Sequence, residues 1–130
     1  MTRILVIDDD AVLRGSVCSV LENAGYEVVE AADGADGLRQ YLAAPTAAVI
    51  TDLDMPVMDG LQLITTLRHT APTAAVIAVS GNPHALTKAR TLTPHTLAKP
   101  FKLLHLLAAV QTLLAAPAPR SAGMELGSDL

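Results

Sequence analysis

The stretch "ILVIDDD" (Ile4–Asp10) passes directly from four apolar residues to three carboxylates. An apolar run without polar alternation is typical of a strand that is covered on both faces, as in a parallel sheet. Two like charges about 4 Å apart repel each other by roughly 4 kcal/mol at the effective dielectric of a protein surface. Three adjacent acids at the end of a buried strand therefore require either a bound cation or full contact with water.

Short apolar runs of this kind alternate with longer amphipathic segments along the chain. In the longer segments, apolar residues recur at intervals of three and four positions, as on one face of a helix. A strand followed by a helix, repeated five times, favours an α/β fold in which a doubly wound parallel sheet carries helices on both faces. We predict strands at 3–8, 26–31, 47–51 and 74–80, and a weaker fifth strand at 95–98.

Glycine and proline residues indicate where the helices begin and end. Gly25 follows the first helical segment as a C-terminal cap, and Pro45 stops the second. The Asp-Gly pair at 59–60 opens the third helix. Residues 83–92 have a poor helical pattern, and Pro94 should end any helix there. We therefore predict a short or irregular fourth helix.

Length and charge exclude several classes of protein. A chain of 130 residues has the size of one domain, which we predict over 1–116, and the unpatterned stretch 117–130 predicts a disordered tail. The formal net charge of -4, without a Lys- or Arg-rich run, argues against direct binding to nucleic acid or to an anionic membrane. The sequence shows neither a bilayer-length apolar segment nor a signal peptide, so we expect a cytoplasmic location.

Polar residues that can carry chemistry stand at the predicted ends of four strands. In open parallel sheets, ligands bind beyond the carboxyl ends of the strands, so these residues should converge on one edge. Clustered carboxylates suit a hard divalent cation such as Mg²⁺, and an aspartate can act as a nucleophile toward phosphorus. A lysine, a hydroxyl and a backbone N–H can bind the phosphoryl oxygens. The residues are Asp8 and Asp9 at the first strand, Asp52 at the third, Ser80 and Gly81 at the fourth, and Lys99 at the fifth.

Four motifs in this order, "ILVIDDD", "TDLDMPVMDG", "AVSG" and "LAKPF", resemble those of the receiver domain of bacterial two-component response regulators. The resemblance extends from residue 3 to near residue 115. It implies a flavodoxin-like (βα)5 fold with strand order 2-1-3-4-5 and Mg²⁺ as the cofactor. It further implies a signalling phosphoacceptor, not an enzyme beyond its own phosphorylation and dephosphorylation. The implied partners are a histidine kinase or histidine phosphotransfer protein and a downstream protein target.

The resemblance also implies roles for the four acids. Asp52 would be the phosphoacceptor and a ligand of Mg²⁺. Asp9 would bind the ion directly, and Asp8 would bind it through water. The backbone carbonyl of Asp54 would complete the protein's share of the coordination. Asp10 is expected only to begin the first helix, where acids are favoured.

The remaining implied roles concern the phosphoryl group and the switch. Lys99 would bind the phosphoryl group, together with the backbone N–H of Gly81. Ser80 would move toward the group as the switch. The peptide bond between Lys99 and Pro100 is usually cis in this family, an isomer that is rare without proline.

The chain departs from the family pattern near its fifth strand. Receivers commonly carry an aromatic residue three positions before the lysine, and that position is Thr96 here. His95 is adjacent, but strand alternation points it to the opposite face. Asp54 and Asn82 occupy the two positions that the family associates with the dephosphorylation rate. The switch region thus comprises Ser80, Asn82 and Thr96, without the usual aromatic side chain.

Two functions of other classes stay open. The sequence "DLD" at 52–54 resembles the nucleophile motif of aspartate-based phosphohydrolases, although those enzymes place it on the first strand. Alternatively, the chain is a receiver-like interaction module with a weak or vestigial phosphorylation switch. Thr96 favours this alternative slightly, whereas the acid pair Asp8 and Asp9 and the lysine Lys99 argue against it.

A homodimer through the face formed by the fourth helix, the fifth strand and the fifth helix is a further open alternative. Leu104 lies off the inward stripe of the last helix and would belong to such a contact. Ordinary partial exposure explains an isolated surface leucine equally simply.

Overall fold

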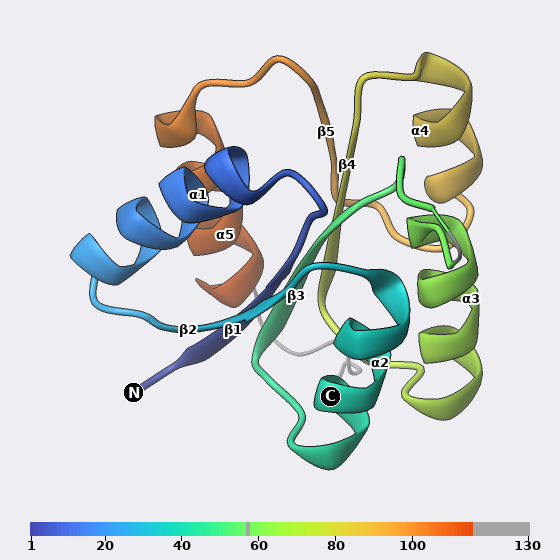
Figure 1. Cartoon of the computed structure of the whole chain (residues 1–130), viewed down its shortest axis with the longest axis horizontal. Helices are drawn as coiled ribbons and strands as arrows, with labels where there is room; N and C mark the ends of the chain where they lie inside the picture. Colours follow the sequence, from blue (N-terminus) through green and yellow to red (C-terminus); the bar gives the residue numbers. More distant parts are fainter. Residues whose placement is uncertain (57, 116–130) are drawn as a thin grey trace, which may run out of the picture.

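The computed structural model describes residues 1–56 and 58–115 as five strands that alternate with five helices (Figure 1). The predicted disordered tail at 117–130 lies outside the described residues. The elements are β1 (Arg3–Ile7), α1 (Ala11–Asn23), β2 (Glu27–Ala31), α2 (Gly34–Ala43), β3 (Ala48–Asp52), α3 (Gly60–Thr70), β4 (Val76–Ser80), α4 (Pro83–Ala89), β5 (Thr96–Ala98) and α5 (Leu103–Ala115).

All five strands are parallel and lie in the order β2-β1-β3-β4-β5, so the predicted topology is confirmed. Helices α1 and α5 cover one face of the sheet, and α2, α3 and α4 cover the other (Figure 1). The central strands β3 and β4 are buried along their whole length, because helices pack on both faces. This double coverage explains why the strands read as unbroken apolar runs.

Two separate cores hold the layers together. On the α1/α5 face, β1 contributes Ile4 and Val6; on the opposite face, it contributes Leu5 and Ile7. Successive side chains of a strand point to opposite faces, so one apolar run supplies both cores.

The predicted helix signals act as expected. Asp10 caps α1 by accepting hydrogen bonds from the backbone N–H groups of Val12 and Leu13. Gly25 follows the end of α1 with a φ of 98°, a conformation that glycine adopts without a steric penalty. Asp59 begins α3 with a reciprocal capping box to Gln62. Asp10 is thus a helix cap, as predicted.

The fourth helix is short, as predicted. It has seven residues, begins at Pro83 behind the Asn82 cap, and ends at Ala89, well before Pro94. The following loop is held by side-chain hydrogen bonds: the Thr93 hydroxyl donates to the carbonyl of Val76 over 2.7 Å. Arg68 of α3 donates to the carbonyl of Leu92 over 2.7 Å. The loop after α4 is therefore held by hydrogen bonds to β4 and α3 rather than by a continuation of the helix.

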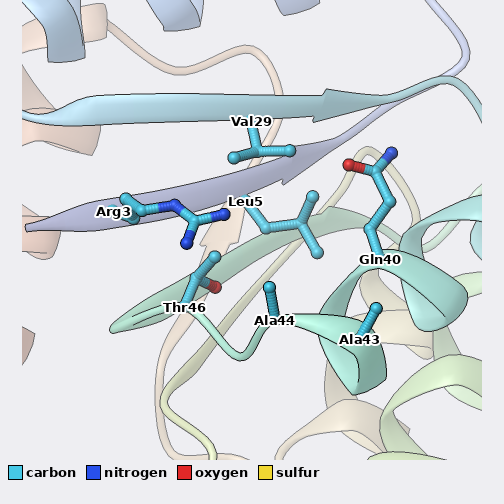
Figure 2. A pocket seen from close by; sticks show the side chains of 7 residues that line it. All are labelled: Arg3, Leu5, Val29, Gln40, Ala43, Ala44 and Thr46. Carbon is cyan, nitrogen blue, oxygen red and sulfur yellow. The ribbon is translucent and has the colours of Figure 1, made fainter.

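A hollow of about 210 Å³ lies at the amino ends of the strands, between the sheet and the end of α2 (Figure 2). It is lined mainly by aliphatic side chains, with Arg3 at its edge, and lies at the end of β1 opposite to the acids.

Leu104 is exposed on α5, and the homodimer stays a prediction. Among the described residues, no helix is long and apolar enough to cross a membrane.

Candidate functional site

The carboxyl ends of the strands bring the predicted acids together. Asp8 directly follows β1, and Asp52 is the last residue of the neighbouring strand β3. Asp8 and Asp52 are 7% and 4% exposed, whereas Asp9 is open to solvent. One carboxylate oxygen of each of these three residues lies within 4.8 Å of the others. The sheet therefore concentrates three carboxylates, two of them buried, at a single point.

Gly60 allows the third helix to start against the end of β3. A Cβ atom at this position would overlap the carbonyl oxygen of Asp52 and would lie 2.8 Å from the Cα of Leu53. The backbone N–H of Gly60 donates to the carbonyl of Leu53 over 3.3 Å. The absence of a side chain at Gly60 thus lets the start of α3 approach the backbone at the end of β3.

Lys99 supplies the positive charge at this edge. Its Nζ lies 3.1 Å from Oδ2 of Asp52 and 3.7 Å from Oδ2 of Asp8. Burial acts to lower the pKa of Lys99, but the hydrogen bond to Asp52 and the charges of Asp52, Asp8 and Asp54 together raise it. Lys99 is therefore held as a cation between two carboxylates.

One lysine does not compensate three carboxylates. The pKa of Asp8 is raised, first by burial and further by the charges of Asp52 and Asp9, although the backbone N–H of Asp10 and the charge of Lys99 oppose the shift. The edge thus keeps an excess of negative charge. A hard divalent cation with oxygen ligands fits this donor set, because carboxylates in reach of one another are the ligands that Mg²⁺ prefers.

Arg14 of α1 fixes the backbone between Asp8 and Asp9, a contact that the sequence did not indicate. Its Nη1 donates to the carbonyl of Asp8 over 2.6 Å, and its Nε donates to Glu30 over 3.0 Å. The side chain of Asp8 also accepts from the backbone N–H of Asp10 over 2.9 Å. The position of the acids therefore depends on a helix and a strand that carry none of the predicted site residues.

Ser80 lies at the end of β4 and is fully buried. Its hydroxyl donates to Oδ2 of Asp54 over 2.8 Å, and it accepts from the backbone N–H of Asn82 over 2.9 Å. The backbone N–H of Asp54 in turn donates to Oδ1 of Asp52 over 3.1 Å. Asp54 was expected to act through its backbone carbonyl and to influence the dephosphorylation rate, but its hydrogen bond to Ser80 was not predicted; the only signal was a second acid two residues after Asp52.

The remaining predicted site residues lie after β4 and on β5: Gly81, Asn82 and Thr96. Gly81 is exposed, and a Cβ there would meet only the Cβ of Lys99 at an ordinary 3.8 Å. The side-chain oxygen of Asn82 caps α4 and accepts from the N–H groups of His84 and Ala85. Thr96 is half-buried on β5 opposite Ala78 of β4.

The peptide bond between Lys99 and Pro100 is cis, as the resemblance implied. The contacts described above join six of the predicted site residues into one connected group: Asp8, Asp9, Asp52, Asp54, Ser80 and Lys99.

Comparison with known proteins gives a consistent result. The family described as "Response regulator receiver domain" matches residues 4–111. The transcriptional regulatory protein PrrA of Mycobacterium tuberculosis is 35% identical over 115 residues, which are 86% of this chain and 49% of that protein. The response regulator MprA of Mycobacterium tuberculosis is 32% identical over 123 residues, covering 92% of this chain and 54% of the relative. The chain thus spans about half the length of the curated relatives it matches.

Solved structures agree with this fold. The chemotaxis protein CheY4 of Vibrio cholerae superposes with a TM-score of 0.81 at 29% identity, covering 88% of this chain and 99% of that one. A CheY-like receiver domain protein of Methanospirillum hungatei gives a TM-score of 0.83 at 26% identity, covering 88% and 94%. With the parallel sheet, the acidic edge and the family match over residues 4–111, the chain belongs to the response regulator receiver domain family of two-component systems.

Proposed function

We propose that this receiver domain accepts a phosphoryl group on Asp52 and thereby changes its contacts with a downstream protein. The donor is a phosphohistidine of a histidine kinase or of a histidine phosphotransfer protein. The observation that carries the proposal is the environment of one carboxylate: Asp52 lies 3.1 Å from the Nζ of Lys99 and within ligand reach of Asp8 and Asp9. A nucleophilic carboxylate beside a cation and a metal-binding acid pair is the arrangement that phosphoryl transfer requires.

The transfer exchanges one bond to phosphorus for another. An oxygen of the Asp52 carboxylate attacks the phosphorus atom, and the bond between phosphorus and the donor imidazole nitrogen breaks. The imidazole nitrogen keeps the electron pair of that bond and takes up a proton from solvent water, so the donor histidine is restored. Asp52 then carries an acyl phosphate. No oxidant or further reactant is needed.

The acids beside Asp52 would hold Mg²⁺. Asp9 and Asp52 would contribute carboxylate oxygens, Asp8 would contribute through water, and Asp54 would contribute its backbone carbonyl. When bound, the ion supplies positive charge that offsets the repulsion between the carboxylates and the phosphoryl oxygens. The positive charge of the ion would also counteract the burial and the repulsion from Asp52 and Asp9, which raise the pKa of Asp8.

Three other groups would bind the phosphoryl oxygens. Lys99 is already directed at Asp52 and would form an ion pair with the transferred group. The Ser80 hydroxyl and the backbone N–H of Gly81 would donate hydrogen bonds from the end of β4. Because α4 begins two residues after Gly81, a shift of Ser80 would reach the surface formed by α4 and β5.

The proposal is tested by incubating the chain with acetyl phosphate, with and without Mg²⁺, and weighing the intact protein. We expect one phosphoryl adduct that requires Mg²⁺ and is absent from Asp52→Asn. Glu22→Gln, which removes an exposed charge from the end of α1, is the matched control and should label as the wild type does. A wild type that takes no adduct beside a receiver that labels normally would support the vestigial module. Repeated turnover of a generic phosphomonoester would support the phosphohydrolase.

A further inference from the structure

We propose that the carboxylate of Asp54 is a latch that holds the Ser80 hydroxyl away from the phosphoryl site in the unphosphorylated chain. This inference rests on the proposed function, because it concerns how the same site is regulated. The Ser80 hydroxyl donates to Oδ2 of Asp54 over 2.8 Å. A hydroxyl has a single proton to donate. Ser80 therefore cannot donate to a phosphoryl oxygen on Asp52 until it leaves Asp54.

The latch is strong because of the groups that form it. Hydrogen bonds to a carboxylate are about twice as strong as those between neutral groups. Ser80 is fully buried, so water does not replace Asp54 as its acceptor. The oxygen of the same hydroxyl accepts from the backbone N–H of Asn82 over 2.9 Å, which fixes its position from the other side. The hydroxyl is thus held at both its proton and its oxygen.

The latch can also be released. Asp54 is exposed to solvent, so its carboxylate is hydrated when Ser80 departs, whereas a buried acceptor would be left unsatisfied. The backbone N–H of Asp54 donates to Oδ1 of Asp52, so the latch sits next to the atom that changes on phosphorylation. A phosphoryl group on Asp52 introduces anionic oxygens that compete with Asp54 for the single hydroxyl proton. Because the Ser80 hydroxyl has one proton and two possible acceptors, it is a two-state element, bound either to Asp54 or to the phosphoryl group.

The start of α4 reports the state of this element. The N–H that binds the Ser80 oxygen belongs to Asn82, and the side chain of Asn82 caps α4 through the N–H groups of His84 and Ala85. Movement of Ser80 therefore acts directly on the residue that caps the helix.

A second effect of Asp54 has to be separated from the latch. Its negative charge repels an anionic group at Asp52 whether or not Ser80 is present. The latch requires the hydroxyl, whereas this repulsion does not. A double-mutant cycle between Asp54→Ala and Ser80→Ala distinguishes the two, because only a direct interaction makes the effects non-additive.

The experiment measures the affinity of each variant for beryllofluoride, a stable phosphoryl analogue, by titration at saturating Mg²⁺. We expect Asp54→Ala to increase the affinity about tenfold in the wild-type background, the size of a hydrogen bond to a charged group. In the Ser80→Ala background, the same change should have less than about a twofold effect. Asp54→Asn, which keeps the size of the side chain, should lie between wild type and Asp54→Ala. Thermal melts of all variants check that they remain folded.

The outcomes separate the latch from the function on which it rests. Equal effects of Asp54→Ala in both backgrounds, or no effect in either, would overturn the latch alone if the wild type binds beryllofluoride and accepts a phosphoryl group from acetyl phosphate. A wild type that does neither would overturn the proposed function, and the latch with it.

Discussion

The two flanks of the acidic edge are built in different ways. On one flank, β1 and β3 present Asp8 and Asp52 from strands that are almost completely buried between two helical layers. On the other flank, α4 has seven residues and β5 has three, and no residue of β5 is fully buried. Arg68 and Thr93 hold this second flank by hydrogen bonds to backbone carbonyls. The flank of β1 and β3, which carries the buried acids, is tightly packed and forms a rigid flank; the flank of α4 and β5 is lightly packed and forms the responsive flank.

The largest expected effect is at the base of the rigid flank. Gly60→Ala should destabilise the fold by about 3 kcal/mol, because a Cβ there overlaps the backbone of Asp52 and Leu53. Denaturant unfolding measures this loss. Gly15→Ala is the control, since nothing lies within 4 Å of a Cβ at that helical position, and alanine should stabilise α1 by up to about 1 kcal/mol. Equal effects of the two substitutions would remove the steric explanation.

Native-state hydrogen exchange compares the flanks directly. Amides of β3 should exchange only by global unfolding, whereas those of α4 should open with a free energy lower by about 2 kcal/mol or more. The reason is burial: every residue of β3 is buried, but α4 buries only Leu86 and Ala89. Protection across 83–93 that equals the protection of β3 would contradict the difference between the flanks.

Arg68 is the main polar support of the responsive flank. Arg68→Met should destabilise the chain by about 1.5 kcal/mol, because the carbonyls of Leu92 and Ala74 each lose a charged donor at 2.7 and 2.6 Å. The lost protection should be concentrated in residues 90–98. Arg39→Met is the matched control: this arginine is highly exposed and, within 1–56 and 58–115, pairs only with Asp36, so little change is expected. A global loss without local change at 90–98 would refute the supporting role.

The smallest effect has the opposite sign. In buffer without divalent cations, Asp8→Asn should stabilise the fold by about 1 kcal/mol, as relief of an unfavourable functional charge commonly does. Asp8 has a raised pKa because of burial and the charges of Asp52 and Asp9. Between the ordinary value of 3.8 and this raised pKa, the folded chain binds a proton that the unfolded chain does not. Acidification through that window should therefore remove the advantage of the variant.

Denaturation midpoints of Asp8→Asn and wild type over a series of pH values, with constant m-values, test this prediction. A variant that is less stable than wild type at neutral pH would show that the contact of Asp8 with Lys99, at 3.7 Å, outweighs the repulsion.

Local patterns were sufficient for most of the fold. The apolar run before Asp8 predicted a doubly covered strand, and Asp10, Gly25 and the pair at 59–60 marked helix ends correctly. These features depend on residues close in sequence, so no knowledge of the tertiary structure was needed. The poor helical pattern of 83–92 similarly predicted a short α4, which ends at Ala89.

The acids of the site could be found from sequence because of topology. Asp8, Asp52, Ser80 and Lys99 each stand at the end of a strand, and parallel strands direct their carboxyl ends to the same edge. The strand ends alone therefore predict the cluster, whatever the details of packing.

Contacts between distant side chains were decided by the tertiary structure. Arg14 reaches the carbonyl of Asp8, Arg68 reaches the carbonyl of Leu92, and Ser80 donates to Asp54 across 26 positions of sequence. Each contact depends on how a helix or loop lies against the sheet, which is fixed by packing of the two cores as a whole. Strand order and strand ends were therefore enough to predict which charged groups meet at the edge. The hydrogen bonds of the serine hydroxyl and of the arginines depend on the folded chain, because they require positions accurate to a fraction of an ångström.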